Sequence, residues 1–148
     1  MSTASRPKAV AVRQSYQFDV PGNPEAWQVQ VRRARRSPAY ERRVAWQEQI
    51  RAAARMYWQG SPLEGLVYLR LEFYRAWPSW APQRHGKAAA RWIDTHLGKK
   101  PDLTNYQKAA EDALSGVIFV DDSQVMGVTA TKDYADADGY TTVWFEIL

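Results

Sequence analysis

The sequence of 148 residues contains no cysteine, which excludes disulfide bonds and zinc sites with thiolate ligands. Its two histidines, His85 and His96, are too few for a Ser-His-Asp triad together with a histidine metal cluster. It also lacks the run of about 20 apolar residues that spans a membrane and the apolar segment of a secretory signal peptide. We therefore expect a cytoplasmic protein without a membrane segment, folded as a single domain.

The charge is unevenly distributed along the chain. Residues 1–55 carry 11 Lys+Arg against 4 Asp+Glu, whereas residues 56–148 carry 9 against 12. A basic front half predicts contact with a polyanion such as DNA. The densest run of basic residues in this half has two interpretations. It is either simply solvated or, as we expect beside a metal site, it contacts DNA phosphates. The arginines of this run are Arg32, Arg33, Arg35 and Arg36.

Hydrophobic periodicity predicts an α/β fold of the α+β type. Residues 1–14 lack an apolar period and indicate a flexible basic arm, which leaves residues 15–148 as the folded domain. Helical spacing predicts two main helices over 39–58 and 104–114, and a short helix near 87–92. Alternating patterns predict strands over 16–20, 66–74, 117–120, 125–131 and 141–147. We expect the last two strands to pair, giving a mixed, largely antiparallel sheet in a single domain.

The first main helix is predicted to be amphipathic. Apolar residues recur along it at helical spacing, and basic residues lie between them. The arginines expected on its polar flanks are Arg42, Arg43, Arg51 and Arg55.

Five carboxylates lie between residues 102 and 122, namely Asp102, Glu111, Asp112, Asp121 and Asp122. At 100° per residue, the helix over 104–114 presents Thr104, Lys108, Glu111 and Asp112 on one face and buries the other. The predicted strand over 117–120 would return Asp121 and Asp122 to this helix. Clustered carboxylates repel one another and favour a cation, and Mg²⁺ binds carboxylates while leaving positions for phosphate oxygens. The sequence therefore predicts an acidic magnesium site beside a basic DNA-binding surface, with Lys108 available to stabilise phosphate charge.

The run KKPDLTNYQKAAEDALSGVIFVDDSQV, residues 99–125, resembles the signature of the RusA-type Holliday junction resolvases of bacteria and their prophages. The segments FDVPGNP and LRLEFY are also similar to that family, so the resemblance covers most of residues 16–147. The matching motif residues are Lys100, Pro101, Asp102, Asn105, Lys108, Asp112-Ala113-Leu114 and Asp121-Asp122-Ser123-Gln124.

This resemblance implies a homodimeric, Mg²⁺-dependent endonuclease, with Mn²⁺ as a substitute, that nicks two opposed strands of a four-way DNA junction in recombination and repair. It implies Asp102 and Asp122 as catalytic metal ligands and Lys108 as the catalytic lysine. We expect Glu111 or Asp121 to assist in holding the metal. Lys100 is expected to join the four arginines in DNA binding. A twofold dimer would present two identical sites to the two scissile strands. The resemblance favours an origin in a prophage or a bacterial recombination gene.

Thr104 departs from the family pattern, because the second aspartate of the motif falls on this position. Either Thr104 caps the helix together with Gln107 and the site has lost a ligand, or Glu111 supplies the missing carboxylate. Glu111 lies about 10.5 Å further along the helix axis and would reach only a metal beside the middle of the helix. Two alternatives therefore remain beside junction resolution: a weakened junction-binding or regulatory protein, and a nuclease of this fold that acts on other branched DNA.

Trp77, Trp80 and Trp92 lie in a long segment rich in proline and basic residues, which also contains both histidines. We expect these tryptophans to pack in the core or at a dimer contact. Stacking on exposed bases at the open centre of a junction is the alternative.

Overall fold

The computed structural model describes residues 14–26, 37–99 and 101–148. The predicted basic arm lies outside the described residues except for Gln14, and Arg32, Arg33, Arg35, Arg36 and Lys100 lie outside them as well. The elements in chain order are β1 (Gln14–Pro21), α1 (Pro38–Tyr57), β2 (Val67–Arg75), α2 (Lys87–His96), α3 (Leu103–Leu114), the short 3-10 helix η1 (Asp122–Gln124), β3 (Val125–Tyr134) and β4 (Tyr140–Ile147).

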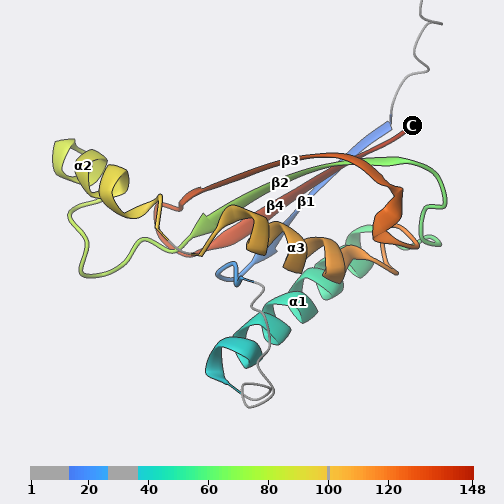
Figure 1. The fold of residues 1–148 in the computed structure, drawn as a ribbon, viewed down its shortest axis with the longest axis horizontal. Coiled ribbons are helices and arrows are strands. Elements are labelled where there is room, and N and C mark those ends of the chain that lie inside the picture. The colour runs from blue at the N-terminus through green and yellow to red at the C-terminus, as the bar shows by residue number, and fades with distance from the viewer. Residues whose placement is uncertain (1–13, 27–36, 100) are drawn as a thin grey trace, which may run out of the picture.

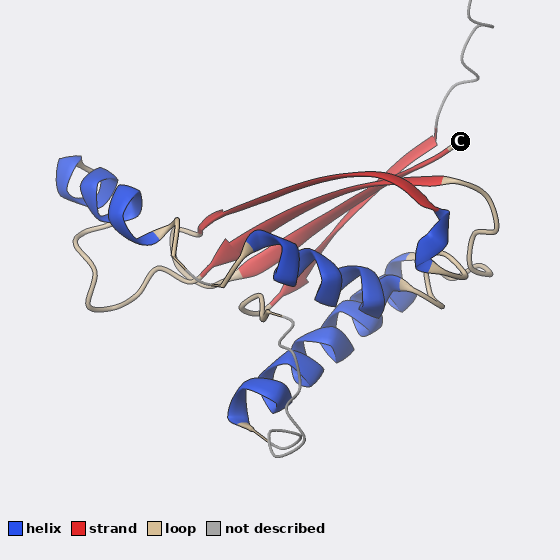
Figure 2. Cartoon of the chain, viewed as in Figure 1, coloured by secondary structure: helices blue, strands red, loops and turns tan. Residues whose placement is uncertain are grey.

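The four strands form one sheet in the order β1-β4-β2-β3 (Figure 1). The central strand β4 pairs antiparallel with β1 and β2, whereas β2 and β3 are parallel. Figure 2 shows α1 and α3 on one side of this sheet. The expected α+β fold, with a mixed and largely antiparallel sheet in a single domain, is confirmed. Among the described residues, none of the helices is long and apolar enough to span a membrane.

The predicted pairing of the last two strands is wrong, because β2 lies between β3 and β4. The segment that joins them crosses the end of β2, where the Ala135 amide donates to the Arg75 carbonyl oxygen at 2.7 Å and the Trp77 amide donates to that of Ala137 at 3.0 Å. These hydrogen bonds satisfy the backbone where the chain passes over the strand end. The chain is thereby carried from one side of β2 to the other.

The predicted strand over 117–120 is also wrong. Directly after α3 the chain turns tightly, and the amides of Val117 and Ile118 both donate to the Leu114 carbonyl oxygen. Gly116 takes a positive φ of 87° in this turn, a conformation that glycine adopts without a steric penalty. Phe119 makes only isolated bridges, to Leu63 and to Ser115. Residues 117–119 are therefore buried, as their apolar side chains require, but they form a turn and not a strand.

The core lies between the sheet and the two main helices. Alternate residues of β2, among them Leu69, Leu71 and Phe73, are buried beneath them. The opposite side of α3 is exposed, as the helical spacing predicted. The buried residues of α3 are Tyr106, Ala109, Ala110, Ala113 and Leu114. The three small alanines allow α3 to lie close against its neighbours.

Helix α1 begins one residue before its predicted start. The Ser37 hydroxyl accepts a hydrogen bond from the Tyr40 amide at 3.1 Å, and Pro38 occupies the first turn, where its missing N–H costs nothing. The expectation that Arg43 lies on a polar flank is wrong, because this residue is only 5% exposed and its guanidinium lies 5.1 Å from the centre of the Tyr40 ring. Since α1 packs against α3 as well as the sheet, it buries a wider face than periodicity indicates.

Gln47 joins the two main helices. It is 5% exposed, and its Nε2 donates to the Ala109 carbonyl oxygen at 3.0 Å and to Asp112 Oδ2 at 3.3 Å. Because a buried polar contact is lost, we expect Gln47→Ala to reduce the free energy of unfolding by about 1–2 kcal/mol in urea denaturation. The exposed neighbour Gln49 provides the control, and Gln49→Ala should change it by less than about 0.5 kcal/mol. Equal effects of the two substitutions would contradict this role for Gln47.

Candidate active site

Asp102 stands at the start of α3. It is the N-cap residue in an extended conformation (φ −70°, ψ 145°), and its side chain makes no capping hydrogen bond. Its carbonyl oxygen instead accepts from the amides of Asn105 and Tyr106. The carboxylate is exposed and is not used by the helix end. Of the two interpretations of Thr104, the one in which it caps this helix is wrong, because the helix begins at Leu103 and already includes Thr104.

Lys132 on β3 holds the segment that leads into Asp102. Its Nζ donates to the carbonyl oxygens of Lys99 at 3.3 Å and Pro101 at 3.2 Å. In the β2–β3 register Lys132 lies opposite Phe73, which is buried beneath the helices. The sheet thus positions the start of the acidic motif. Sequence reasoning missed this contact, since a lone lysine in a strand carries no signal of its partner.

A second acidic group lies at the other end of α3. Burial raises the pKa of Glu111, a hydrogen bond from Gln107 (3.2 Å) lowers it, and the negative charge of Asp122 raises it further. Asp122 is therefore close enough to Glu111 for the two charges to interact. Asp112 is exposed and accepts from Gln47 of α1. Lys108 is exposed on α3 between the two acidic groups.

The turn that carries Asp121 and Asp122 is a capped 3-10 helix. The Asp121 carboxylate accepts from the Ser123 amide at 3.1 Å. Hydrogen bonding from the Ser123 side chain, and then from its backbone amide, holds the pKa of Asp121 below its usual value. The Gln124 side chain accepts from the Asp121 amide at 2.8 Å and donates to the carbonyl oxygens of Leu63 at 2.6 Å and Gly65 at 2.8 Å. Gln124, part of the motif but given no role by the sequence, therefore anchors the turn.

The two acidic groups lie far apart in one chain. Asp102 precedes α3 and Asp122 follows it, and the 12 residues of this helix extend about 18 Å. Strand β3 gives a second measure of this separation, because it starts just after Asp122 and Lys132 on it binds the backbone just before Asp102. The strand from Val125 to Lys132 extends about 23 Å. Within the described part of the chain, no group of three or more His, Asp or Glu side chains lies close enough to hold a metal ion. The turn after α3 leaves Asp121 and Asp122 at the C-terminal end of the helix. They are not returned to its N-terminal end, where Asp102 lies.

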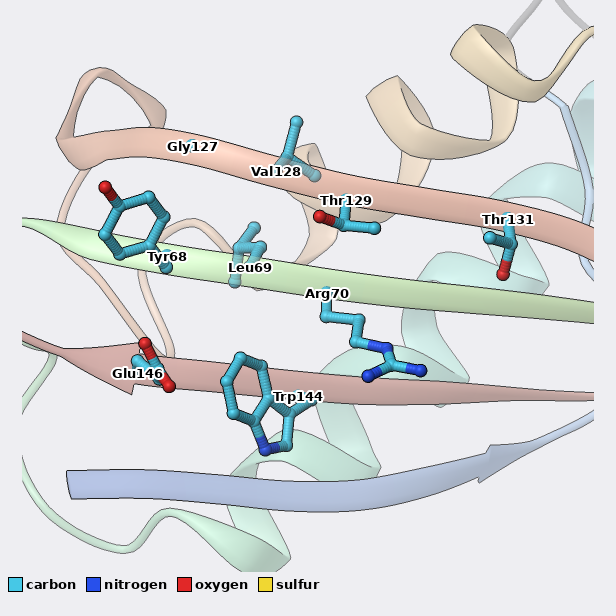
Figure 3. A pocket seen from close by; sticks show the side chains of 9 residues that line it. All are labelled: Tyr68, Leu69, Arg70, Gly127, Val128, Thr129, Thr131, Trp144 and Glu146. Carbon is cyan, nitrogen blue, oxygen red and sulfur yellow. The ribbon is translucent and has the colours of Figure 1, made fainter. Parts of the chain in front are cut away.

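The uncovered face of the sheet carries a separate cavity of about 470 Å³. Figure 3 shows the Arg70 and Trp144 side chains on neighbouring strands in this region, and Arg70 forms an ion pair with Glu72 at 2.9 Å. The lining residues come from β2, β3 and β4, and they are Tyr68, Leu69, Arg70, Gly127, Val128, Thr129, Thr131, Trp144 and Glu146. Glu146 is the single carboxylate among them. The cavity therefore does not offer the oxygen ligands that a magnesium site needs.

The tryptophans of the long segment divide into two kinds. Trp77 and Trp92 are partly buried and pack on one another, with their ring centres 4.8 Å apart. Trp80 is 72% exposed. His96 stacks on Trp92 at 4.2 Å, and His85 lies 3.4 Å from the Asp136 carboxylate. Both histidines therefore have contacts at the tryptophan segment or the loop after β3, and neither lies at α3.

The role of Gln124 is open to direct measurement. We expect Gln124→Ala to reduce the free energy of unfolding by about 1–3 kcal/mol, because the Gly65 carbonyl and the Asp121 amide lose this partner and the Leu63 carbonyl keeps only the Val120 amide. Amide hydrogen exchange at residues 121–124 should also become faster. Gln49→Ala, which removes the same kind of side chain at an exposed position of α1, is the control. Unchanged exchange in the Gln124 variant would show that the turn does not depend on this side chain.

Comparison with known proteins agrees with these motifs. A family model described as Endodeoxyribonuclease RusA matches residues 19–144. The Uncharacterized protein YqaN of Bacillus subtilis (strain 168) is 33% identical over 75 residues, which cover 50% of this chain and 53% of that protein. The match thus spans about half the length of this curated relative. Because the family model covers both acidic groups and all of α3, we conclude that the chain belongs to the RusA endodeoxyribonuclease family.

Proposed function

We propose that this protein is a divalent-metal-dependent endonuclease that resolves four-way DNA junctions by paired nicks. The observation that carries this proposal is the exposed, charged face of α3. Asp102 precedes it, Lys108 lies on it, and Asp122 follows it beside Glu111. All four residues lie in the segment that matches the nuclease family.

The donor set fits a hard divalent cation. The candidate ligands Asp102, Asp122 and Glu111 offer only carboxylate oxygens, which suit Mg²⁺ or Mn²⁺. The charge of Asp122 acts on Glu111, and a cation bound between these two carboxylates would offset their repulsion. When bound, such an ion polarises the phosphodiester and lowers the pKa of the attacking water.

The remaining charged groups of the motif have separate roles in this proposal. Lys108 stabilises the negative charge that develops on the phosphate. Glu111 replaces the carboxylate that the family carries at the position of Thr104. Asp121 assists by holding the turn that presents Asp122, through its bond to the Ser123 amide. Five of the basic residues outside the described part of the chain contact DNA phosphates in this proposal. They are Arg32, Arg33, Arg35, Arg36 and Lys100.

A homodimer would bring the separated acidic groups together. With about 18 Å of helix between them, Asp102 and Asp122 cannot share one metal ion within a chain. If two copies pack with their α3 helices side by side and antiparallel, the start of one helix meets the end of the other. The same symmetry presents two equivalent sites to the two scissile strands of a junction.

The first test is cleavage of a synthetic four-way junction by the full chain, with and without Mg²⁺. We expect symmetric nicks that require the metal, and a loss of roughly 100-fold or more in rate for Asp122→Asn and for Glu111→Gln, because each removes a negatively charged ligand. Asp138→Asn, at an exposed carboxylate in the loop before β4, is the control. Full activity of the Glu111 variant beside an inactive Asp122 variant would exclude Glu111 as a ligand.

Two other outcomes would select the alternative functions. Junction binding without cleavage in either Mg²⁺ or Mn²⁺ would identify a binding or regulatory protein whose site has lost a ligand at Thr104. Cleavage of flaps or other branched DNA, but not of four-way junctions, would identify a nuclease with a different substrate.

The shared site is tested by mixing two inactive variants. Asp102→Asn and Asp122→Asn chains, unfolded and refolded together, form mixed dimers in which one site retains both carboxylates if each site uses two chains. We expect such mixtures to recover nicking of one junction strand, measured on strand-specifically labelled junctions, whereas each variant alone stays inactive. The control is a mixture of Asp122→Asn with the Asp122→Asn, Asp138→Asn double variant. No recovery in a mixture shown to contain mixed dimers would exclude a site shared between chains.

A further inference from the structure

Residues 76–99 form an arm at one end of the sheet, which we call the α2 arm. Figure 1 shows α2 beyond the end of the strands and away from α1 and α3. Ala89 is the single buried residue of this helix. The core therefore does not require α2, and the fold presents it as an appendage.

The base of the arm is nevertheless firmly attached. The Trp92 ring lies 4.8 Å from that of Trp77 and 5.1 Å from that of Tyr134 on β3, measured between ring centres. Trp77 Nε1 donates to the Pro82 carbonyl oxygen at 2.8 Å. Arg84 lies 4.8 Å over the Trp77 ring and donates to the Tyr134 carbonyl oxygen at 3.1 Å. These contacts attach the loop before α2 to the helix and to β3.

Trp80 lies at the outer side of this aromatic cluster. Its ring meets those of Trp92 (5.3 Å) and His96 (5.9 Å) edge-on, while 72% of the residue stays exposed. Exposed apolar residues that occur singly are common on proteins. This ring differs because the rings of Trp92 and His96 contact it and restrict its rotamers. It therefore loses little side-chain entropy when a ligand stacks on it.

The arm also differs in charge from the rest of the described fold. Outside it, the described residues carry 8 Lys+Arg against 15 Asp+Glu. Within it, Asp94 is the single anion, and Asp136 of the following loop lies 3.4 Å from Arg84. The cations of the arm are Arg84, Lys87, Arg91 and Lys99. A DNA backbone is therefore attracted to the arm more strongly than to the remaining described surface.

We propose that the α2 arm is a nucleobase-stacking site, in which Trp80 stacks on a base left unpaired or unstacked at a DNA branch point. Lys87 and Arg91, exposed on α2, contact the flanking phosphates. The arm continues through the segment held by Lys132 into Asp102, so a base on Trp80 lies toward the Asp102 end of α3. Stacking on an aromatic ring tolerates any base. The site would therefore select branched DNA over duplex without reading sequence.

This proposal rests on the proposed function, and binding without cleavage separates the two. The full chain is titrated in EDTA with a four-way junction that carries 2-aminopurine at the branch point, and with a fully paired duplex of the same sequence. We expect Trp80→Ala to weaken junction binding about tenfold, to abolish the 2-aminopurine fluorescence change, and to leave duplex binding within about twofold. Trp80→Phe should retain most of the junction affinity, because it keeps an aromatic face.

Met56→Ala is the matched control. Met56 is 80% exposed near the end of α1, which Figure 1 places at the other end of the molecule from α2. This variant should bind both DNAs like the parent. Circular dichroism and light scattering on all variants report folding and oligomeric state.

Three results would overturn the stacking site: unchanged junction affinity of Trp80→Ala, an equal loss on junction and duplex, or a change of oligomeric state that accounts for the loss. If the parent cleaves junctions while Trp80→Ala binds them normally, the stacking site fails and the proposed function stands. If Trp80→Ala shows the selective loss while the parent cleaves no DNA, the stacking site stands and the nuclease proposal fails. A parent that binds no branched DNA contradicts both.

Discussion

The packing of α3 against α1 and the sheet is the constraint on which the candidate site depends. Tyr106 and a row of alanines bury one side of the helix, so the opposite side must carry the charged residues. Because α3 is a rigid helix of about 18 Å, it also sets the separation of Asp102 from Asp122. The same helix therefore exposes the acidic motif and divides it into two groups.

Two side chains from outside α3 hold the ends of the motif. Lys132 binds the backbone before Asp102, and Gln124 binds the loop at Leu63 and Gly65 while capping the turn at Asp121. In both cases the charged or amide group binds backbone carbonyls. The carboxylates of Asp102 and Asp122 are thereby presented at the surface on positioned backbone, which suits the metal-binding role proposed for them.

The order of strands in the sheet could not be predicted from hydrophobic periodicity. Every strand of the sheet was expected within a few residues of its observed position, because alternation reports which residues face the core. The partners of each strand were not determined by this pattern. Five residues between β3 and β4 would suit a hairpin. They instead carry the chain over the end of β2, so that β3 pairs with β2 on an edge.

The sequence by itself determined the α+β class, the positions of the two main helices, the charged face of α3 and the resemblance to a nuclease family, because these depend on local spacing and on motif residues. Only the tertiary structure decided that Arg43 is buried, that Thr104 lies inside the helix, and that Asp102 and Asp122 stand at opposite ends of it. It also decided that Trp77 and Trp92 support an exposed Trp80. The burial of Arg43 and the support of Trp80 depend on contacts between segments distant in the chain. The two ends of α3 are set by backbone hydrogen bonds that the pattern of residue types does not record.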